Sequence, residues 1–160
     1  MGTCAIEGCT DTSVGKSKYC TPHKEVAHKA WKALITDNAE EREGRNRAWA
    51  DLHKEAHEAG MRASEAHKPT PMGVVGGGQT YVVAGGVCGF AWVKVVPGGC
   101  SFARWAKKNV DRSHKGYRNG LEIWCPLSTQ SMTTKESYCD AYAKVLESRG
   151  VKAYSQSRMD

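Results

Sequence analysis

The stretch CAIEGCTDTSVGKSKYCTPH, residues 4–23, decides how the N-terminal part of this chain folds. Three cysteines and one histidine stand in it with the spacing C-x4-C-x10-C-x2-H. Three thiolates and an imidazole are the donors of a tetrahedral zinc site, and the short spacing within each pair suits two tight turns. All four positions would be filled by protein, which predicts structural rather than catalytic Zn2+. The predicted ligands are Cys4, Cys9, Cys20 and His23.

The residues after the third cysteine predict a helix. Thr21-Pro22 fits a helix cap and first position, so His23 would lie in the first turn. This order, a knuckle followed by a helix that carries the second ligand pair, resembles a treble-clef-like zinc finger. Modules of the form C-x4-C followed by Y-C-x-x-H are similar to those of short actinobacterial phage proteins. We therefore place a zinc finger at residues 1–24.

The remaining cysteines fit a reducing compartment. Seven is an odd number, the sequence shows no apolar signal peptide, and no run approaches the ~18 apolar residues of a membrane span. We therefore expect a cytoplasmic protein without membrane contact. Four cysteines without paired spacing are expected to be buried and inert: Cys88, Cys100, Cys125 and Cys139.

The length and the charge distribution of the chain indicate its domain content and where a polyanion could bind. The chain has 160 residues, 40% apolar and 25% charged, enough for one ordinary core and a small appendage. Residues 1–70 hold 11 basic and 11 acidic side chains, whereas residues 71–160 hold 12 and 6. Attraction for a polyanion therefore belongs to the C-terminal part.

Residues 25–68 are rich in Ala, Glu, Lys and Arg and predict either one long helical strut or a hairpin of two helices. A break would fall at Asp37-Asn38-Ala39-Glu40, which has the form of a capping box. His53 and His57 flank the apolar seam and are expected to face solvent or a partner. The helices are candidates for self-association or a protein partner. The seam follows a 3-4 spacing and comprises Trp49, Leu52, Ala56, Ala59, Ala63 and Ala66.

A Pro/Gly linker is expected at residues 69–79, followed by a domain at 80–160. Its pattern predicts strands at 81–84 and 90–96, a helix from Ser101, a strand at 121–127, a helix opened by the capping box Thr133-Thr134-Lys135-Glu136, and a strand from Val151. The order ββαβαβ fits a two-layer α+β fold. Residues 90–160, with GFAWVKVVPGG, SFARWAKKN and QSMTTKESYCDAYAKVLESRG, resemble small domains encoded by tailed phages, which implies a viral origin and no mechanism.

The densest basic segment of this domain predicts contacts with nucleic acid. Cations neutralise phosphates and exposed aromatic rings stack on bases. A solvated basic face without a ligand is the alternative. Phe102 and Trp105 are expected in the core, which leaves one candidate stacking residue. The candidate residues are Arg104, Lys107, Lys108, Arg112, Lys115, Tyr117 and Arg118.

A second polar cluster would converge at the start of the last helix if the final strand runs beside it, where an anion could bind. The alternative is a polar loop and a frayed tail. No nucleophile is paired with a base, and the histidine and asparagine order of H-N-H endonucleases is absent. The cluster comprises Gln130, Ser131, Lys135, Ser157, Arg158 and Asp160.

Together these features favour a non-enzymatic, phage-type binding protein that contacts nucleic acid or a host nucleoprotein. It would act in the host cytoplasm. The alternative is a minor virion component, an adaptor or a host-protein inhibitor that uses its helices. A small hydrolase or transferase using the polar cluster is the least favoured reading.

Overall fold

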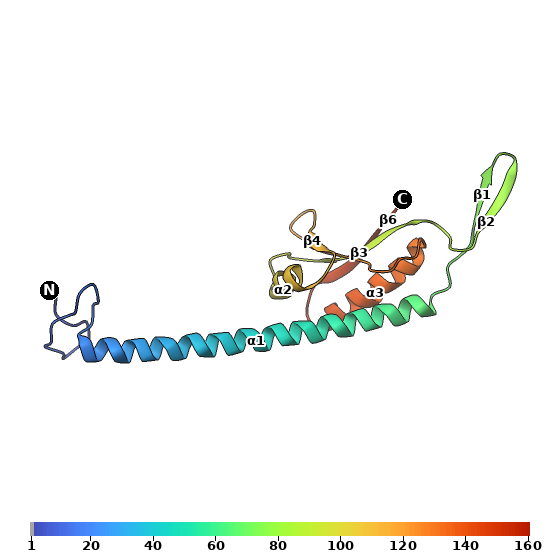
Figure 1. Cartoon of the computed structure of the whole chain (residues 1–160). Coiled ribbons are helices and arrows are strands. Elements are labelled where there is room, and N and C mark those ends of the chain that lie inside the picture. Colours follow the sequence, from blue (N-terminus) through green and yellow to red (C-terminus); the bar gives the residue numbers. More distant parts are fainter. Residues whose placement is uncertain (1) are drawn as a thin grey trace. The chain divides into compact units, whose positions relative to one another are not determined.

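The computed structural model describes residues 2–160, which fall into two units, one ending at Arg45 and one from Asn46 to Asp160. The fold is α+β, as predicted: a long helix is followed by two antiparallel sheets and two further helices. Helix α1 (Thr21–Ala66) supplies residues to both units (Figure 1). No helix within residues 2–160 combines the length and the apolar character needed to cross a bilayer.

Helix α1 runs without a break, so the helical strut is confirmed and the hairpin of two helices is wrong. The segment Asp37–Glu40 is helical and exposed. A capping box starts a helix only where the chain before it leaves the helical conformation. No proline or paired glycine forces that departure here, and the polar side chains are solvated on the helix surface.

The second half of α1 packs against the C-terminal domain through a stripe that repeats every four residues: Leu52, Ala56, Gly60 and Ser64 are buried. The predicted seam contains the first two of these residues, Leu52 and Ala56, and then departs from the buried stripe. Glycine and serine, not alanine, allow the closest approach of α1 to the domain. A Cβ at Gly60 would lie 2.7 Å from the ring of Tyr138.

The two histidines of α1 belong to this interface, so the expectation that they face solvent or a partner is wrong. Nδ1 of His53 lies 2.5 Å from the hydroxyl of Tyr142, and Nδ1 of His57 lies 2.6 Å from that of Tyr138. Two histidines four residues apart on one helix thus meet two tyrosines four residues apart on another. Each imidazole thus has a tyrosine hydroxyl as its hydrogen-bond partner.

The expected linker contains a strand. Strands β1 (Met72–Gly76) and β2 (Gln79–Val83) form an antiparallel hairpin. Gly77 and Gly78 both have positive φ (59° and 79°), as the two central residues of a type I′ turn require. The glycine run that suggests a flexible connection therefore makes a tight turn, and the predicted pairing of residues 81–84 with 90–96 is wrong.

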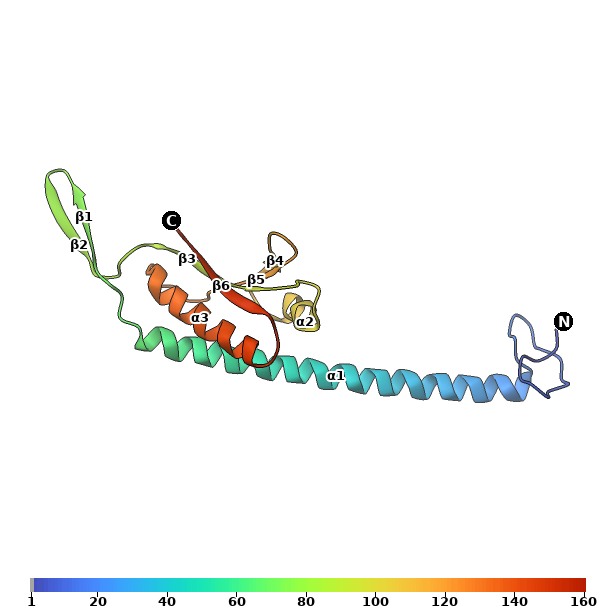
Figure 2. The ribbon, with the colours of Figure 1, turned by 180° about the vertical axis from the view of Figure 1, so that it is seen from behind.

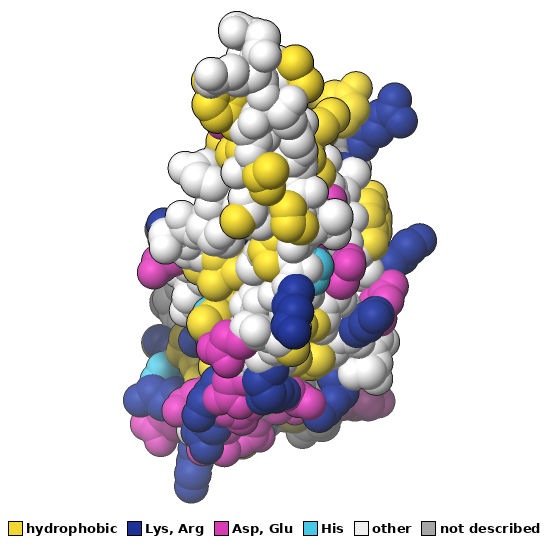
Figure 3. Space-filling view, turned by 90° about the vertical axis from the view of Figure 1, so that its right-hand side faces the viewer, with side chains coloured by type: hydrophobic (Ala, Val, Ile, Leu, Met, Phe, Trp, Pro, Cys, Tyr) yellow, Lys and Arg dark blue, Asp and Glu magenta, His cyan; other side chains and the backbone are white. Residues whose placement is uncertain are grey.

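The hairpin is uncharged, since no Asp, Glu, Lys or Arg occurs from Pro69 to Val93. Val75 and Val82 are 78% and 75% exposed. Figure 3 shows the hairpin at the top of the view in white and yellow only.

The second sheet has four strands in the order β4-β5-β3-β6, with every neighbouring pair antiparallel. With its two helices the order along the chain is β-α-β-β-α-β, the split β-α-β pattern. Strand β4 was not predicted, because three polar residues give no apolar alternation. The elements are β3 (Gly89–Val95), α2 (Ser101–Asn109), β4 (Ser113–Lys115), β5 (Leu121–Trp124), α3 (Met132–Ser148) and β6 (Ala153–Met159).

The core of this unit lies between the sheet and its helices. Ala91, Val93 and Val95 of β3 are buried against α3, as the alternation of the strand predicts. Figure 2 shows α3 lying between the strands and α1. The largest fully buried side chains are Tyr142, Phe102, Leu121, Leu146, Val93, Val95 and Cys139.

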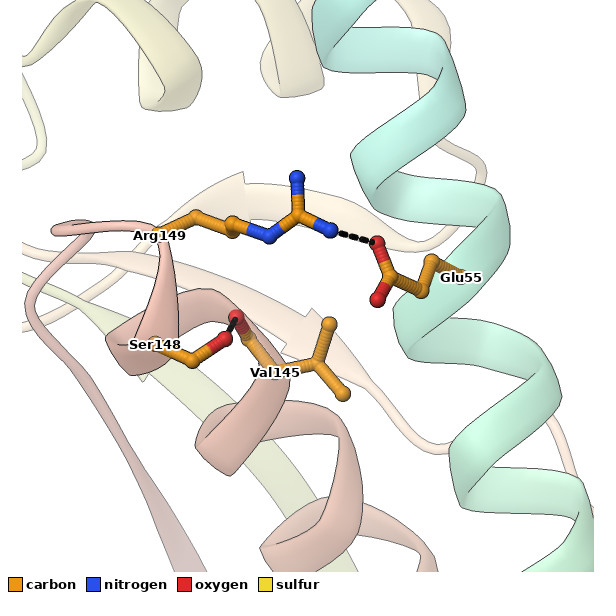
Figure 4. Close-up of polar contacts among 4 residues, drawn as sticks. All are labelled: Glu55, Val145, Ser148 and Arg149. Atoms are coloured by element: carbon orange, nitrogen blue, oxygen red, sulfur yellow. Dashed lines mark hydrogen bonds and ion pairs between the residues drawn. The ribbon is translucent and has the colours of Figure 1, made fainter.

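The cap of helix α3 lies two residues before Thr133, the first residue of the predicted capping box. The hydroxyl of Ser131 accepts a hydrogen bond from the backbone N–H of Thr134 (3.4 Å), so Ser131 is the cap. The helix ends before Gly150, whose φ of 76° is the expected stop. Near this end Arg149 forms a 2.8 Å ion pair with Glu55 of α1 (Figure 4).

Candidate functional site

Two tight turns shape the candidate metal-binding module, one within the first ligand pair and one in the spacer between the pairs. The backbone N–H of Cys9 donates to the carbonyl of Ile6 (3.1 Å), and that of Ser17 donates to Val14 (3.1 Å). The carbonyl of Cys20 accepts the N–H of Lys24, so this cysteine lies at the start of α1. His23 is in the first helical turn, where the sequence places it.

The four predicted ligand atoms lie within 4.8 Å of one another. A tetrahedral Zn2+ with Zn–S bonds of about 2.3 Å separates two ligand sulfurs by about 3.8 Å, and a sulfur from an imidazole nitrogen by about 3.5 Å. The Sγ atoms of Cys9 and Cys20 are 3.8 Å apart. Nδ1 of His23 lies 3.4 Å from Sγ of Cys4 and 3.2 Å from Sγ of Cys20. The donor set and its spacing therefore fit a four-coordinate ion.

The same contacts set the protonation of the thiols. Burial raises the pKa of Cys4, but hydrogen bonds from the backbone N–H groups of Cys20 and Ile6 and from His23 outweigh it and lower that pKa to about 6. For Cys20, a backbone hydrogen bond from His23 lowers the pKa, while burial and the neighbouring thiols raise it further, to about 11. One thiolate thus forms readily, and metal binding must release further protons.

Every predicted nucleic-acid-binding residue is exposed. The segment comprises part of α2, strand β4 and the loops on either side of β4. The two elements are in contact, and the hydroxyl of Ser113 donates to the carbonyl of Ala106 (3.0 Å). Phe102 is buried and Trp105 is half-buried, as predicted. The exposed set is Arg104, Lys107, Lys108, Arg112, Lys115, Tyr117 and Arg118.

Two arginines of this segment occupy strained backbone positions. Arg112 and Arg118 have φ values of 57° and 52°, in the left-handed region that favours glycine. The guanidinium of Arg118 lies over the ring of Tyr117, 5.4 Å from its centroid, and that ring is 75% exposed. The segment therefore holds cations where the fold alone would prefer glycine.

The polar C-terminal cluster does converge, because β6 returns beside the start of α3, and its members contact the fold itself. Ser131 caps the helix, and the ammonium of Lys135 donates to the carbonyl of Gly89 (2.8 Å). Ser157 donates to Glu136, and Arg158 lies over the ring of Phe90. Gln130 and Asp160 anchor the strand start through their backbones, to Gly89 and Cys88. These contacts tie the strands to the helix.

An aromatic cluster escaped the sequence-based site prediction. On the sheet face opposite the helices, named here the outer face, the rings of Trp92 and Trp124 stack with centroids 5.3 Å apart and planes 18° apart. Phe90 and His114 each approach Trp124 to 5.8 Å. Alternation in β3 assigns Phe90 and Trp92 to one face, but sequence cannot show that no helix covers it.

Comparisons with models of protein families, with curated proteins and with solved structures find no match for this chain.

Proposed function

We propose that this protein binds nucleic acid through the exposed basic segment of α2 and β4, while a zinc finger folds its N-terminal unit. The observation that carries the proposal is the accessibility of all seven predicted residues, which lie on the contacting elements α2 and β4 and on the loops beside β4. Within residues 104–118 only Asp111 opposes the six lysines and arginines. Such a surface neutralises phosphates and releases counterions.

The strained arginines give independent support. A left-handed conformation costs a residue with a Cβ about 1–2 kcal/mol relative to glycine. Arg112 and Arg118 bear that cost, and their side chains are solvent-exposed. Strain at an exposed cation is understandable when the side chain serves binding.

The zinc assignment extends the metal-binding geometry. Cys4 and Cys20 are buried, and all four donors come from protein, so the ion would have no open position for substrate. Its role would be to stabilise a unit too small for a core of its own. The resemblance of both ends of the chain to phage-encoded modules supports a phage origin, with action in the host cytoplasm.

Salt-dependent binding tests the proposal. Fluorescence anisotropy would measure the affinity of the zinc-loaded protein for labelled duplex DNA, single-stranded DNA and single-stranded RNA from about 50 to 200 mM salt. The variant Lys107→Ala/Lys108→Ala/Arg112→Ala should weaken binding and flatten the salt slope by up to about 2.7 for duplex or about 2.1 for single strands.

The matched control removes the same charge elsewhere in the domain: Lys54→Ala/Arg62→Ala/Lys144→Ala changes three exposed cations of α1 and α3. This control should retain the affinity and slope of the parent. Equal losses in both triple variants, or no binding of any nucleic acid at about 50 mM salt, would refute the proposal.

A second candidate is a structural or adaptor protein in which α1 pairs with another helix. Its support is an exposed apolar group in the first half of α1, where Trp31, Leu34 and Ile35 are 57%, 59% and 46% exposed. Sedimentation equilibrium would detect self-association, which Trp31→Ala/Leu34→Ala should abolish. A monomeric parent at high micromolar concentration would remove self-association.

A further inference from the structure

We propose that the outer face of the four-stranded sheet binds single-stranded RNA, with Phe90, Trp92 and Trp124 stacking on its bases. The inference deepens the proposed function, on which it rests for the electrostatic attraction. It names the class of nucleic acid and a second contact surface, distinct from the basic segment.

The aromatic residues stand on the two adjacent inner strands of the sheet. Trp92 of β3 is directly opposite Trp124 of β5, and the two rings already form a parallel stack. Phe90 lies two residues before Trp92, on the same face, and approaches Trp124. A planar base extends such an arrangement, and stacking accepts every base because each has a π-face. Aromatic side chains on the open face of a four-stranded sheet are a known platform for unpaired RNA bases.

The composition of this face is unusual for a surface without a ligand. In an antiparallel sheet with helices on one side, the opposite side is normally polar. Here Phe90, Trp92 and Trp124 are all partly exposed, and Tyr154 of β6 is 42% exposed. Partly exposed rings grouped on one face are a candidate interaction site, although the Nε1–H of Trp124 is itself buried without a hydrogen-bond partner.

Charge selects a polyanion as the occupant. Among the strand residues on this face, Lys94 and Arg158 are the permanent cations, of which Lys94 is buried, and Glu122 is the carboxylate. That carboxylate lies 3.9 Å from the imidazole of His114. The guanidinium of Arg158 lies 5.5 Å from the centroid of the Phe90 ring, so a cation borders the stacking surface. An acidic backbone with stacked bases matches this combination better than an apolar protein surface does.

The outer face meets the basic segment at β4, where His114 pairs with Glu122 on the outer face and Lys115 pairs with Leu121 on the opposite one. His114 of β4 contacts the ring of Trp124, and the exposed Lys115 follows it at the sheet edge. A strand of nucleic acid can therefore cross the rings and leave over the cations of β4 and its loops.

The side chains around the stacked rings match single-stranded RNA better than duplex or DNA. Duplex bases are paired and stacked, so their faces cannot reach the indoles. The carboxamide oxygen of Gln156 accepts the Nε1–H of Trp92 (3.2 Å), which places a polar amide beside the stack. A hydrogen-bonding group at this place can contact a ribose 2′-hydroxyl, which DNA lacks.

The test is anisotropy with a labelled 12-nucleotide uridine oligomer, its deoxy counterpart and a 12-base-pair duplex. Phe90→Leu and Trp124→Leu keep apolar volume and remove a π-face, and each should weaken RNA binding by about 5- to 150-fold without changing the salt slope. The control Trp31→Leu removes an exposed indole from α1 and should bind as the parent does.

The outcomes separate the two proposals. Unchanged affinity in both leucine variants, with a weakened basic-segment variant, overturns the outer-face inference and leaves the proposed function. If the leucine variants bind RNA more weakly while the basic-segment variant is unaffected, the outer-face inference stands and the proposed role of the basic segment is overturned. A deoxy oligomer or duplex bound as tightly as RNA overturns the RNA assignment. If circular dichroism shows that Trp124→Leu is unfolded, the test is made on the parent protein. RNA must then quench the tryptophan emission of the parent, and a lack of quenching overturns the inference.

Discussion

The closest helix contact in the C-terminal domain predicts a penalty for a single added methyl group. At Gly60 of α1, an alanine Cβ would lie 2.7 Å from two ring carbons of Tyr138 and 3.0 Å from its carbonyl oxygen. The ring cannot move freely, because its hydroxyl is hydrogen-bonded to His57. Overpacking of this kind costs about 1–3 kcal/mol, whereas alanine in place of helical glycine returns about 1 kcal/mol. Gly60→Ala should therefore lower the free energy of unfolding by up to about 2 kcal/mol.

Gly44 is the matched control, since it lies in the same helix and a Cβ there meets nothing within 4 Å. Gly44→Ala should not destabilise the protein and should raise the free energy of unfolding by up to about 1 kcal/mol. Urea denaturation followed at 222 nm measures both variants. In a Tyr138→Leu background, Gly60→Ala should cost at least about 1 kcal/mol less, because the obstructing ring is gone. A Gly60→Ala protein as stable as Gly44→Ala would refute the packing argument.

Three further predictions concern pH, capping and metal. Burial, and then the charge of His57, hold the pKa of His53 below its ordinary value. The stability that this neutral side chain contributes is therefore present above about pH 6.5 and is lost as the pH falls below it. His53→Gln should reduce this loss in urea titrations. Ser131→Ala should cost about 1 kcal/mol by calorimetry, whereas Thr133→Ala, two residues later, should cost less because it is not the cap. Elemental analysis should find one zinc per parent chain and almost none in Cys20→Ser; zinc near one per variant chain would contradict the ligand assignment.

Much of the C-terminal domain could be predicted from sequence, because its signals are local. Gly150 marks the stop after α3, and the alternation of β3 gives its buried face. The cap of α2 is Cys100, one residue before Ser101, which the sequence suggests as the cap. The four candidate metal ligands could also be predicted from the sequence, since the chemistry depends on residue type and spacing. The structure brings those four side chains within coordination distance.

The missed features depend on contacts distant in sequence. His53 and His57 have no local signal for burial, because their partners lie 89 and 81 residues further along the chain. The type I′ turn at Gly77-Gly78 has the composition of a flexible connection, and only the pairing of its flanking strands distinguishes the two. The outer face is aromatic in the sequence, but its exposure depends on which side of the sheet the helices occupy.

Helix α1 has a practical consequence for dividing the protein. A fragment that begins at residue 69 or 80, where the sequence suggests a boundary, would strip Leu52 and Ala56 from the core and leave the hydroxyls of Tyr138 and Tyr142 without their histidine partners. A fragment from Asn46 onward keeps every one of these groups. The compact C-terminal unit therefore starts in the middle of a helix, and truncations should be designed to cut there.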